Sequence, residues 1–476
     1  MAAGRVVMSC GRRWRSRTAV LPMVVGAALL VVSTTGAKAA RGDDALQATT
    51  DLVRSGDADL RAVGLERVRD GLRGATATRA LADTLLPTLD APRQRALVTA
   101  LAERGDAAAL PGILRLLDGS ADEAVRAAAL LAVATLGGPG DVPVLVRALT
   151  KGGAEEAAAR RGLVIVGGAG AVDAIRTAAR TAPPAVHTML CDILASRRAT
   201  AAAPDLVAAA VADDAGLRGA ALRALAQIGS AAEVPGMVRG VLRADAGRER
   251  DEAERALVAV CSTGRDRERA AAAFLEAFNS APAAEQALLA GMLGRLGGPR
   301  SLALVEQLLA DPARRSLGLE ALSRWPDASI KDRLLELFAA AADDGERNLL
   351  LATLIRIAPL PNNTLDDAQK LELLRRTMDL CQRDEDRRRV LERANAIRTV
   401  AALRFVVPYL DQPALAESAC LSVVELAHHQ KLRDDNKAEF TTALDRVLAM
   451  TKNPELVERS QRYKEGRTWN RKAPGG

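Results

Sequence analysis

The feature that most constrains the fold of this 476-residue chain is an internal repeat with a period near 32 residues. Glycines that interrupt helical apolar patterns occur at positions 105, 137, 167, 229, 264 and 297. Their spacings are 32, 30, 62, 35 and 33 residues, and the interval of 62 holds two units with Ser196-Arg197 at the intervening turn. Pro111, Pro143, Pro204 and Pro235 fall at one point of their units. This regularity predicts a stack of similar structural units.

The unit at 122–149 shows what each repeat contains. Its first half places small apolar residues at helical spacing, including Val125, Ala129 and Val133. Its second half places apolar residues at i, i+3, i+4 and i+7, namely Val142, Leu145, Val146 and Leu149. The pattern predicts two amphipathic helices that cannot bury their apolar faces alone, so neighbouring units must stack.

Local signals place the ends of these helices. Ser120 and Glu123 have the spacing of a capping box, which predicts the start of the first helix. Gly137-Gly138 is expected to stop this helix with a residue in the left-handed conformation. Pro143 fits the first turn of the second helix, where a missing N–H has no cost. On this basis units are predicted to begin at 57, 91, 121, 153, 183, 214, 246, 281, 312, 346, 384 and 413.

The composition agrees with close helix packing. Hydrophobic residues make up 49% of the chain but aromatic residues only 2%, and alanine is abundant. Alanine at helix contacts allows close approach and has a high helix propensity. The shortage of aromatic rings removes the stacking platforms that single-stranded nucleic acids need. Arginine far outnumbers lysine, and we interpret this excess as a bias towards GC-rich codons.

The sequence DEAVRAAALLAVATLGG at 122–138, followed by VPVLVRAL at 142–149, resembles HEAT repeats. It is most similar to the short bacterial subtype named after phycobilisome lyases. The resemblance implies an all-α fold, a right-handed α-solenoid of about twelve helix pairs, with second helices lining the concave side. Together with its leader and its closing residues 462–466 and Trp469, the chain also resembles exported HEAT-repeat proteins of planctomycete-type bacteria.

Residues 1–39 are predicted to be a secretory signal peptide. Five arginines without an acidic residue precede an apolar run from Ala19 to Ser33, and Ala37-Lys38-Ala39 forms an A-x-A cleavage site. We therefore expect cleavage after Ala39 and a periplasmic or secreted protein. The alternative is an uncleaved anchor, which would be the chain's contact with a membrane.

The rest of the chain is predicted to contain a capping helix at 40–56, a HEAT-like array at 57–358, divergent HEAT-like repeats at 359–465 and a disordered tail at 466–476. The segment PLPNNT at 359–364 breaks the period and marks the boundary between the two arrays.

Removing the signal segment also removes most of the net charge of +7. Six of the 66 basic residues lie in it and none of the 59 acidic ones, so the remainder holds 60 basic residues against 59 acidic ones. Overall basicity therefore gives no support to a nucleic-acid partner, and none is expected.

The sequence offers no motif for a cofactor, a metal ion or catalysis. Its three histidines, His187, His428 and His429, lack the i, i+4 spacing of a metal site, and neither a G-x-S-x-G motif nor a P-loop occurs. The carboxylate pairs at 213–214 and 366–367 are expected to cap helices. The cysteines at 191, 261, 381 and 420 are expected to be buried small hydrophobes, although the sequence leaves one disulfide open.

One pattern of charge does suggest a binding surface. Four residues after the proline of the second helix stand Arg115, Arg147 and Arg239, with Arg176 close to the same place, and Lys151, Arg180 and Arg243 follow about one turn later. In later units the matching residues are Gln307 and Glu336. We call the seven cationic residues the basic row. It would suit an acidic protein segment or a polyanionic glycan; the alternative is an ordinary solvated helix face.

These observations favour an exported, non-enzymatic scaffold that binds protein partners through its concave surface. A second hypothesis is an accessory module of an exported carbohydrate-active or redox enzyme. A bilin-lyase-like enzyme is the third, and export argues against it. The sequence does not define an oligomeric state.

Overall fold

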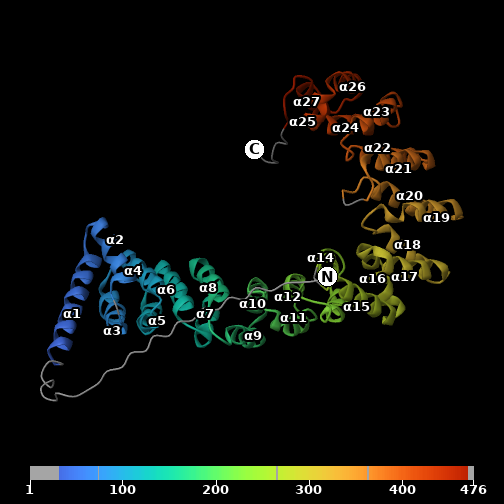
Figure 1. Ribbon diagram of the computed structural model, residues 1–476. Helices are drawn as coiled ribbons and strands as arrows, with labels where there is room; N and C mark the ends of the chain where they lie inside the picture. Colours follow the sequence, from blue (N-terminus) through green and yellow to red (C-terminus); the bar gives the residue numbers. More distant parts are fainter. Residues whose placement is uncertain (1–31, 73, 264–265, 362–363, 470–476) are drawn as a thin grey trace, which may run out of the picture. The chain divides into compact units, whose positions relative to one another are not determined.

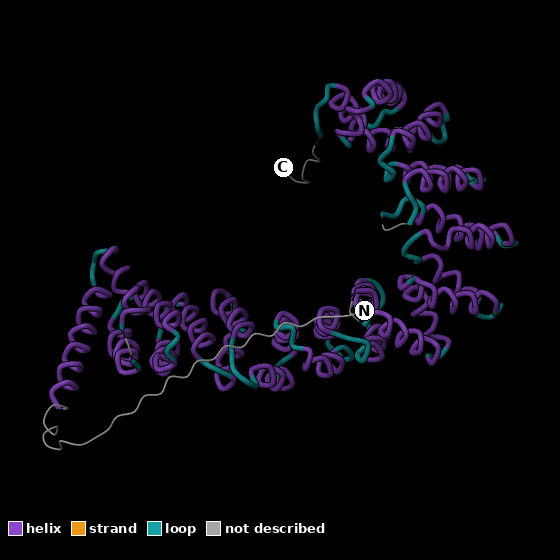
Figure 2. Tube along the Cα trace, viewed as in Figure 1, coloured by secondary structure: helices purple, strands orange, loops and turns teal. Residues whose placement is uncertain are grey.

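The computed structural model describes residues 32–72, 74–263, 266–361 and 364–469. Within these ranges the chain forms helices and connecting turns, and no strand occurs (Figures 1 and 2). The apolar run of the predicted signal segment lies largely outside the described residues. The helix α1 (Val32–Arg54) begins before the predicted cleavage site and continues through the predicted capping helix. No helix among the described residues is both long and apolar enough to cross a membrane.

The repeat predicted from the glycine spacing is present as helix pairs. The first helices begin within three residues of the predicted unit starts; they are α2 (Ala58–Glu66), α4 (Ala91–Arg104), α6 (Glu123–Leu136), α8 (Gly153–Ile165), α10 (Pro184–Ser196), α12 (Ala215–Ile228), α14 (Arg248–Thr263), α16 (Ala283–Leu296), α18 (Arg315–Ser323), α20 (Asp344–Ile357), α22 (Asp384–Ala394) and α24 (Ala416–His428).

Each first helix is followed by a second helix. These are α3 (Ala75–Arg79), α5 (Leu110–Gly119), α7 (Val142–Ala148), α9 (Ala171–Thr181), α11 (Ala203–Ala209), α13 (Val234–Arg243), α15 (Arg267–Ser280), α17 (Gly298–Ala310), α19 (Lys331–Ala340), α21 (Asp367–Leu380), α23 (Val400–Val406) and α26 (Lys437–Met450). The short α25 (Gln430–Asp435) precedes α26, and α27 (Pro454–Lys464) closes the array. The arrangement is an all-α helical-repeat solenoid.

The chain divides into two compact units. The first runs as far as Asp141 and also takes in Lys151–Gly162, and the second comprises Val142–Thr150 and everything from Leu163 onward. In the second unit, successive first helices from α10 to α24 pack side by side (Figure 1). The boundary predicted at 359 lies inside this second unit and stays a prediction.

Small aliphatic side chains fill the space between the helices. The buried core consists mainly of alanine, leucine and valine, with Phe274, Phe278 and Trp325 as rare large members. At the contact between α16 and α18, a Cβ added to Gly294 would stand 1.8 Å from the carbonyl oxygen of Ala321. Glycine is therefore needed here because the two backbones nearly touch.

Two of the predicted helix-end signals are wrong in detail. Asp122, and not Ser120, is the N-cap of α6, where its side chain accepts a hydrogen bond from the Val125 N–H. Gly137 ends the helix with an extended φ of −88°, so no left-handed residue is used there. A side chain at 137 would instead collide with the Asp141 carboxylate, at 2.4 Å. Gly105, with φ 73°, does take the left-handed C-cap conformation that was expected at 137.

Two residues of the segment predicted to be a tail, Arg467 and Trp469, contact α27. The Arg467 N–H donates to the Arg462 carbonyl at 2.9 Å, and Trp469 lies 4.8 Å from the guanidinium of Arg459. Residues 470–476 lie outside the described residues.

Candidate partner-binding surface on the second helices

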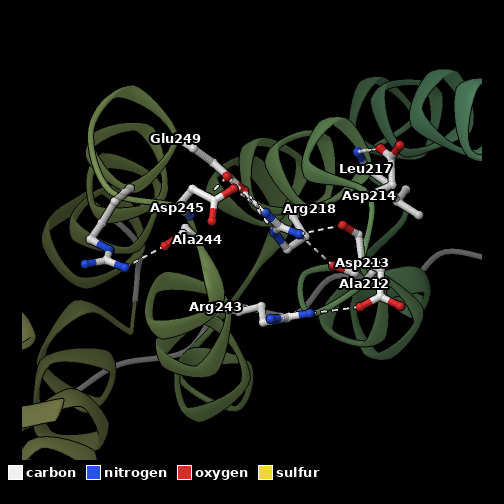
Figure 3. Close-up of polar contacts among 10 residues, drawn as sticks. Ala212, Asp213, Asp214, Leu217, Arg218, Arg243, Ala244, Asp245 and Glu249 are labelled. Atoms are coloured by element: carbon white, nitrogen blue, oxygen red, sulfur yellow. Dashed lines mark hydrogen bonds and ion pairs between the residues drawn. The ribbon is translucent and has the colours of Figure 1, made fainter. Parts of the chain in front are cut away.

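A recurring arginine in the first helices fixes the turns that surround the candidate surface. Arg218, in α12, donates from Nη1 to the carbonyls of Ala212 and Asp213 at 3.0 and 2.8 Å (Figure 3). Its Nε and Nη2 atoms donate to the two carboxylate oxygens of Glu249 in α14, at 2.8 and 3.0 Å. Arg218 is only 4% exposed, so one buried side chain joins a turn to the next repeat.

The same bond recurs along the chain. Eight arginines donate to the carbonyl six residues earlier, at 2.6 to 3.3 Å; we call them the junction arginines, and they are Arg61, Arg126, Arg218, Arg250, Arg315, Arg347, Arg387 and Arg433. Carbonyls at a helix C-terminus lack intrahelical donors and carry partial negative charge, so a guanidinium satisfies both needs.

Three junction arginines also reach a glutamate in the first turn of the next first helix. The pairs are Arg126–Glu155 at 2.7 Å, Arg218–Glu249 at 2.8 Å and Arg315–Glu346 at 2.5 Å. The hydrogen bond to Glu155 raises the pKa of Arg126. Part of the arginine excess is therefore structural, and codon bias alone is an incomplete interpretation. The signal in the sequence is an arginine five to nine residues after the end of a helix.

A second group of arginines, at the ends of first helices, joins one first helix to the one before it. Arg197 donates to the carbonyls of Leu163 and Val166 at 2.7 and 2.9 Å, and Arg356 donates to that of Trp325 at 2.7 Å. Burial lowers the pKa of both Arg197 and Arg356.

The basic row separates into paired and unpaired members. Arg115 of α5 pairs with Asp83 at 2.6 Å, and Arg243 of α13 pairs with Asp213 at 2.9 Å. Asp213 belongs to the turn that Arg218 holds, so a junction arginine positions the carboxylate that meets Arg243 (Figure 3).

The most heavily paired part of the row lies between α9 and α11. Both Arg176 and Arg180 donate to the carboxylate of Asp205, at 2.5 and 2.9 Å from their Nε atoms, and Arg176 also reaches Asp173 at 2.9 Å. Burial alone would raise the pKa of Asp205, but the bonds from the two guanidiniums outweigh it and lower the pKa. Four arginines of the row are thus balanced by four aspartates.

The other members of the row are Arg147, Lys151 and Arg239. All three are exposed, and none forms an ion pair within the described part of the chain. Arg239 makes only a long bond of 3.4 Å to the Pro235 carbonyl. Six of the seven residues lie on second helices, whereas Lys151 lies in the bend between α7, which ends at Ala148, and α8. The sequence did not show which members already have a carboxylate. In later units, acidic residues enter this face, where Glu306 and Glu336 both contact Arg333.

The remaining candidate groups take structural positions. Asp214 caps α12 and Asp366 caps α21, the latter in a full capping box with Gln369. The four cysteines of the described ranges are free and buried, as expected. The Nδ1 atom of His428 lies 2.9 Å from the Tyr463 hydroxyl. No group of three or more potential metal ligands occurs among the described residues.

Comparison with known proteins identifies the repeat. A sequence model of HEAT repeats matches residues 78–164, from α3 to α8. The chain therefore contains HEAT repeats in this segment. No curated protein matches the sequence of this HEAT-repeat chain.

Several solved structures resemble the HEAT-repeat chain at low identity. Kap121p bound to Nup53p shares 12% identity at a TM-score of 0.47, and the karyopherin Kap121p bound to the SUMO protease Ulp1p shares 11% at 0.48. Each covers 89% of this chain and 53% of its own, so the chain spans about half the length of these karyopherins. The complex of CpcE and CpcF of phycocyanin lyase from Nostoc sp. PCC7120 shares 20% identity at a TM-score of 0.21, covering 65% of this chain and 93% of its own. Similarity at this level says nothing about partner or activity.

Proposed function

We propose that this HEAT-repeat protein is an exported, non-enzymatic scaffold. Its second helices bind the acidic segment of a protein partner. The observation that carries the proposal is that Arg147 and Arg239, both in the second unit, are exposed on second helices and form no ion pair with any described residue. Helical repeats commonly present such side chains in register to one extended partner. Export is proposed from the leader sequence of residues 1–39.

The charge balance supports an acidic partner and narrows the contact residues. Arg115, Arg176, Arg180 and Arg243 already satisfy carboxylates within the chain. A partner would have to replace these bonds, whereas Arg147 and Arg239 offer guanidiniums at no such cost. Guanidiniums bind carboxylates in a bidentate manner, which gives orientation as well as affinity. We therefore assign the first contacts to Arg147 and Arg239, both in the second unit.

The test compares two charge-reversal variants of the full chain. Arg147→Glu with Arg239→Glu reverses the unpaired cations, and Arg255→Glu with Arg388→Glu reverses two exposed arginines of first helices. A partner is first identified by crosslinking in the host and mass spectrometry, and is then purified for titration. We expect the second-helix variant to bind at least about tenfold more weakly at low salt, and the first-helix variant to bind like the wild type.

The opposite pattern would reject the proposal. If the purified partner binds both variants as tightly as the wild type, the second helices do not carry the contact. If the partner is instead an enzyme whose activity depends on this chain, the accessory-module hypothesis replaces the simple scaffold.

A further inference from the structure

A cavity at the C-terminal end of the array is independent of the basic row. It has a volume of about 320 Å³ and lies among α25, α26 and α27, in the second unit. Its lining includes cationic side chains and the aromatic residues Phe440 and Tyr463. No residue of the basic row lines the cavity, so the cavity requires its own explanation.

One of the cations that line this cavity is the junction arginine Arg433. Its side chain is only 3% exposed, its Nη1 atom donates to the Ala427 carbonyl at 2.7 Å, and its guanidinium lies 5.2 Å from the centre of the Tyr463 ring. The Nη2 atom is buried and has no hydrogen-bond partner within the described residues. A buried charged donor without an acceptor is unfavourable, so an anion beside it would be stabilised.

Two lysines add positive charge to the same cavity. Lys437, in the first turn of α26, is exposed and forms no ion pair among the described residues, while Lys464, at the end of α27, pairs with Asp445. Asp434 also lines the cavity, and its carboxylate lies 3.6 Å from Nε of Arg433. The lining therefore contains three cations and one carboxylate.

The size and the apolar walls define the ligand further. A cavity of about 320 Å³ is far larger than an inorganic anion and falls in the range of small-molecule sites. Phe440 and Tyr463 provide apolar surface beside the cationic group. We propose that this cavity binds a small organic anion, with a carboxylate or phosphate head at Arg433 and Lys437 and a compact apolar body against Phe440.

Calorimetric titration of the full chain with phenyl phosphate tests this site. We expect a Kd of about 1 mM or lower. Benzoate should also bind, because it likewise combines an anionic group with an aromatic ring. Inorganic phosphate should bind at least about tenfold more weakly, because it lacks the apolar ring. Equal binding of inorganic phosphate would overturn the assignment of the apolar wall, and absence of phenyl phosphate binding at 10 mM, about ten times the expected Kd, would overturn the site.

A matched pair of variants locates the binding. Lys437→Glu reverses an exposed cation of the cavity and should weaken phenyl phosphate binding at least about tenfold. Lys431→Glu makes the same charge change on an exposed residue of α25 that does not line the cavity, and binding should change by less than about twofold. Photolabelling with 4-azidophenyl phosphate should mark peptides within 433–466. Equal effects of the two variants, or labelling elsewhere, would show that binding is not at this cavity.

Discussion

Replacement of Arg218 by methionine should destabilise the second unit by about 3 kcal/mol. Methionine keeps an apolar stem but leaves the carbonyls of Ala212 and Asp213 without their donor, which costs about 1 kcal/mol each. The Glu249 side chain, 19% exposed, loses its cation, and this partial exposure limits the further cost to about 1 kcal/mol. The contribution of the lost ion pair is well below that of a fully buried ion pair, because water reaches the Glu249 carboxylate.

The assay is urea unfolding monitored by far-ultraviolet circular dichroism, combined with hydrogen exchange of the peptide that contains residues 210–217. Arg223→Met is the matched control because Arg223 is exposed on the same helix, α12, and should change stability by less than about 0.5 kcal/mol. Glu249→Gln keeps an acceptor and should cost about 1 kcal/mol. In Arg218→Met the exchange of the turn at 212–214 should accelerate most.

Unfolding of Arg218→Met and Arg223→Met at the same urea concentration would refute this prediction. Loss of stability in Arg218→Met while the turn at 212–214 keeps its protection from exchange would also refute it, because the loss would then come from packing and not from the carbonyl bonds.

Four other outcomes follow from the structure. Gly294→Ala should destabilise by about 3 kcal/mol in urea unfolding because its Cβ meets a carbonyl oxygen, whereas Gly291→Ala in the same helix, with no atom nearer than 3.6 Å, should stabilise by about 0.5–1 kcal/mol. Arg198→Gly should raise stability by about 1 kcal/mol because Arg198 has a φ of 55°; an unchanged midpoint would refute this strain. Asp205 has a lowered pKa, so its stabilising effect is present above its ordinary pKa of 3.8 and is lost as pH falls through the folded value; the stability gap between wild type and Asp205→Asn should therefore narrow below about pH 4. Burial raises the pKa of Cys191 and Cys261 to about 12, and of Cys381 and Cys420 to about 11, so in a Cys10→Ser chain Ellman's reagent at pH 8 should react only after denaturant is added.

The repeat register could be predicted from the sequence because it depends on local signals. Turn glycines, second-helix prolines and apolar spacing each act within one unit, and together they place the first helices to within three residues. The exact caps do not follow from the sequence, because Ser120 and Asp122 both have side chains that can cap α6. Only the backbone geometry decides between them.

The charged contacts were harder to predict because they join different repeats. The positions of Arg176 and Arg243 on second helices follow from helical periodicity, but their partners Asp205 and Asp213 stand 29 and 30 residues away. Which carboxylate reaches which guanidinium depends on the rotation between neighbouring units. For the same reason, no pattern in the sequence indicated that a buried Arg218 would link three segments.

The junction arginines bear on how such a chain can change its length during evolution. Each one bonds to the turn six residues before it, and some also bond to a glutamate about one repeat later, as in Arg126–Glu155 and Arg218–Glu249. Every donor and acceptor therefore belongs to a unit or to its immediate neighbour. After duplication or loss of one whole repeat, an equivalent arginine would again bond to an equivalent turn, and no charged group would lose its partner. An insertion of half a repeat would instead separate junction arginines from the turns and glutamates that they bind.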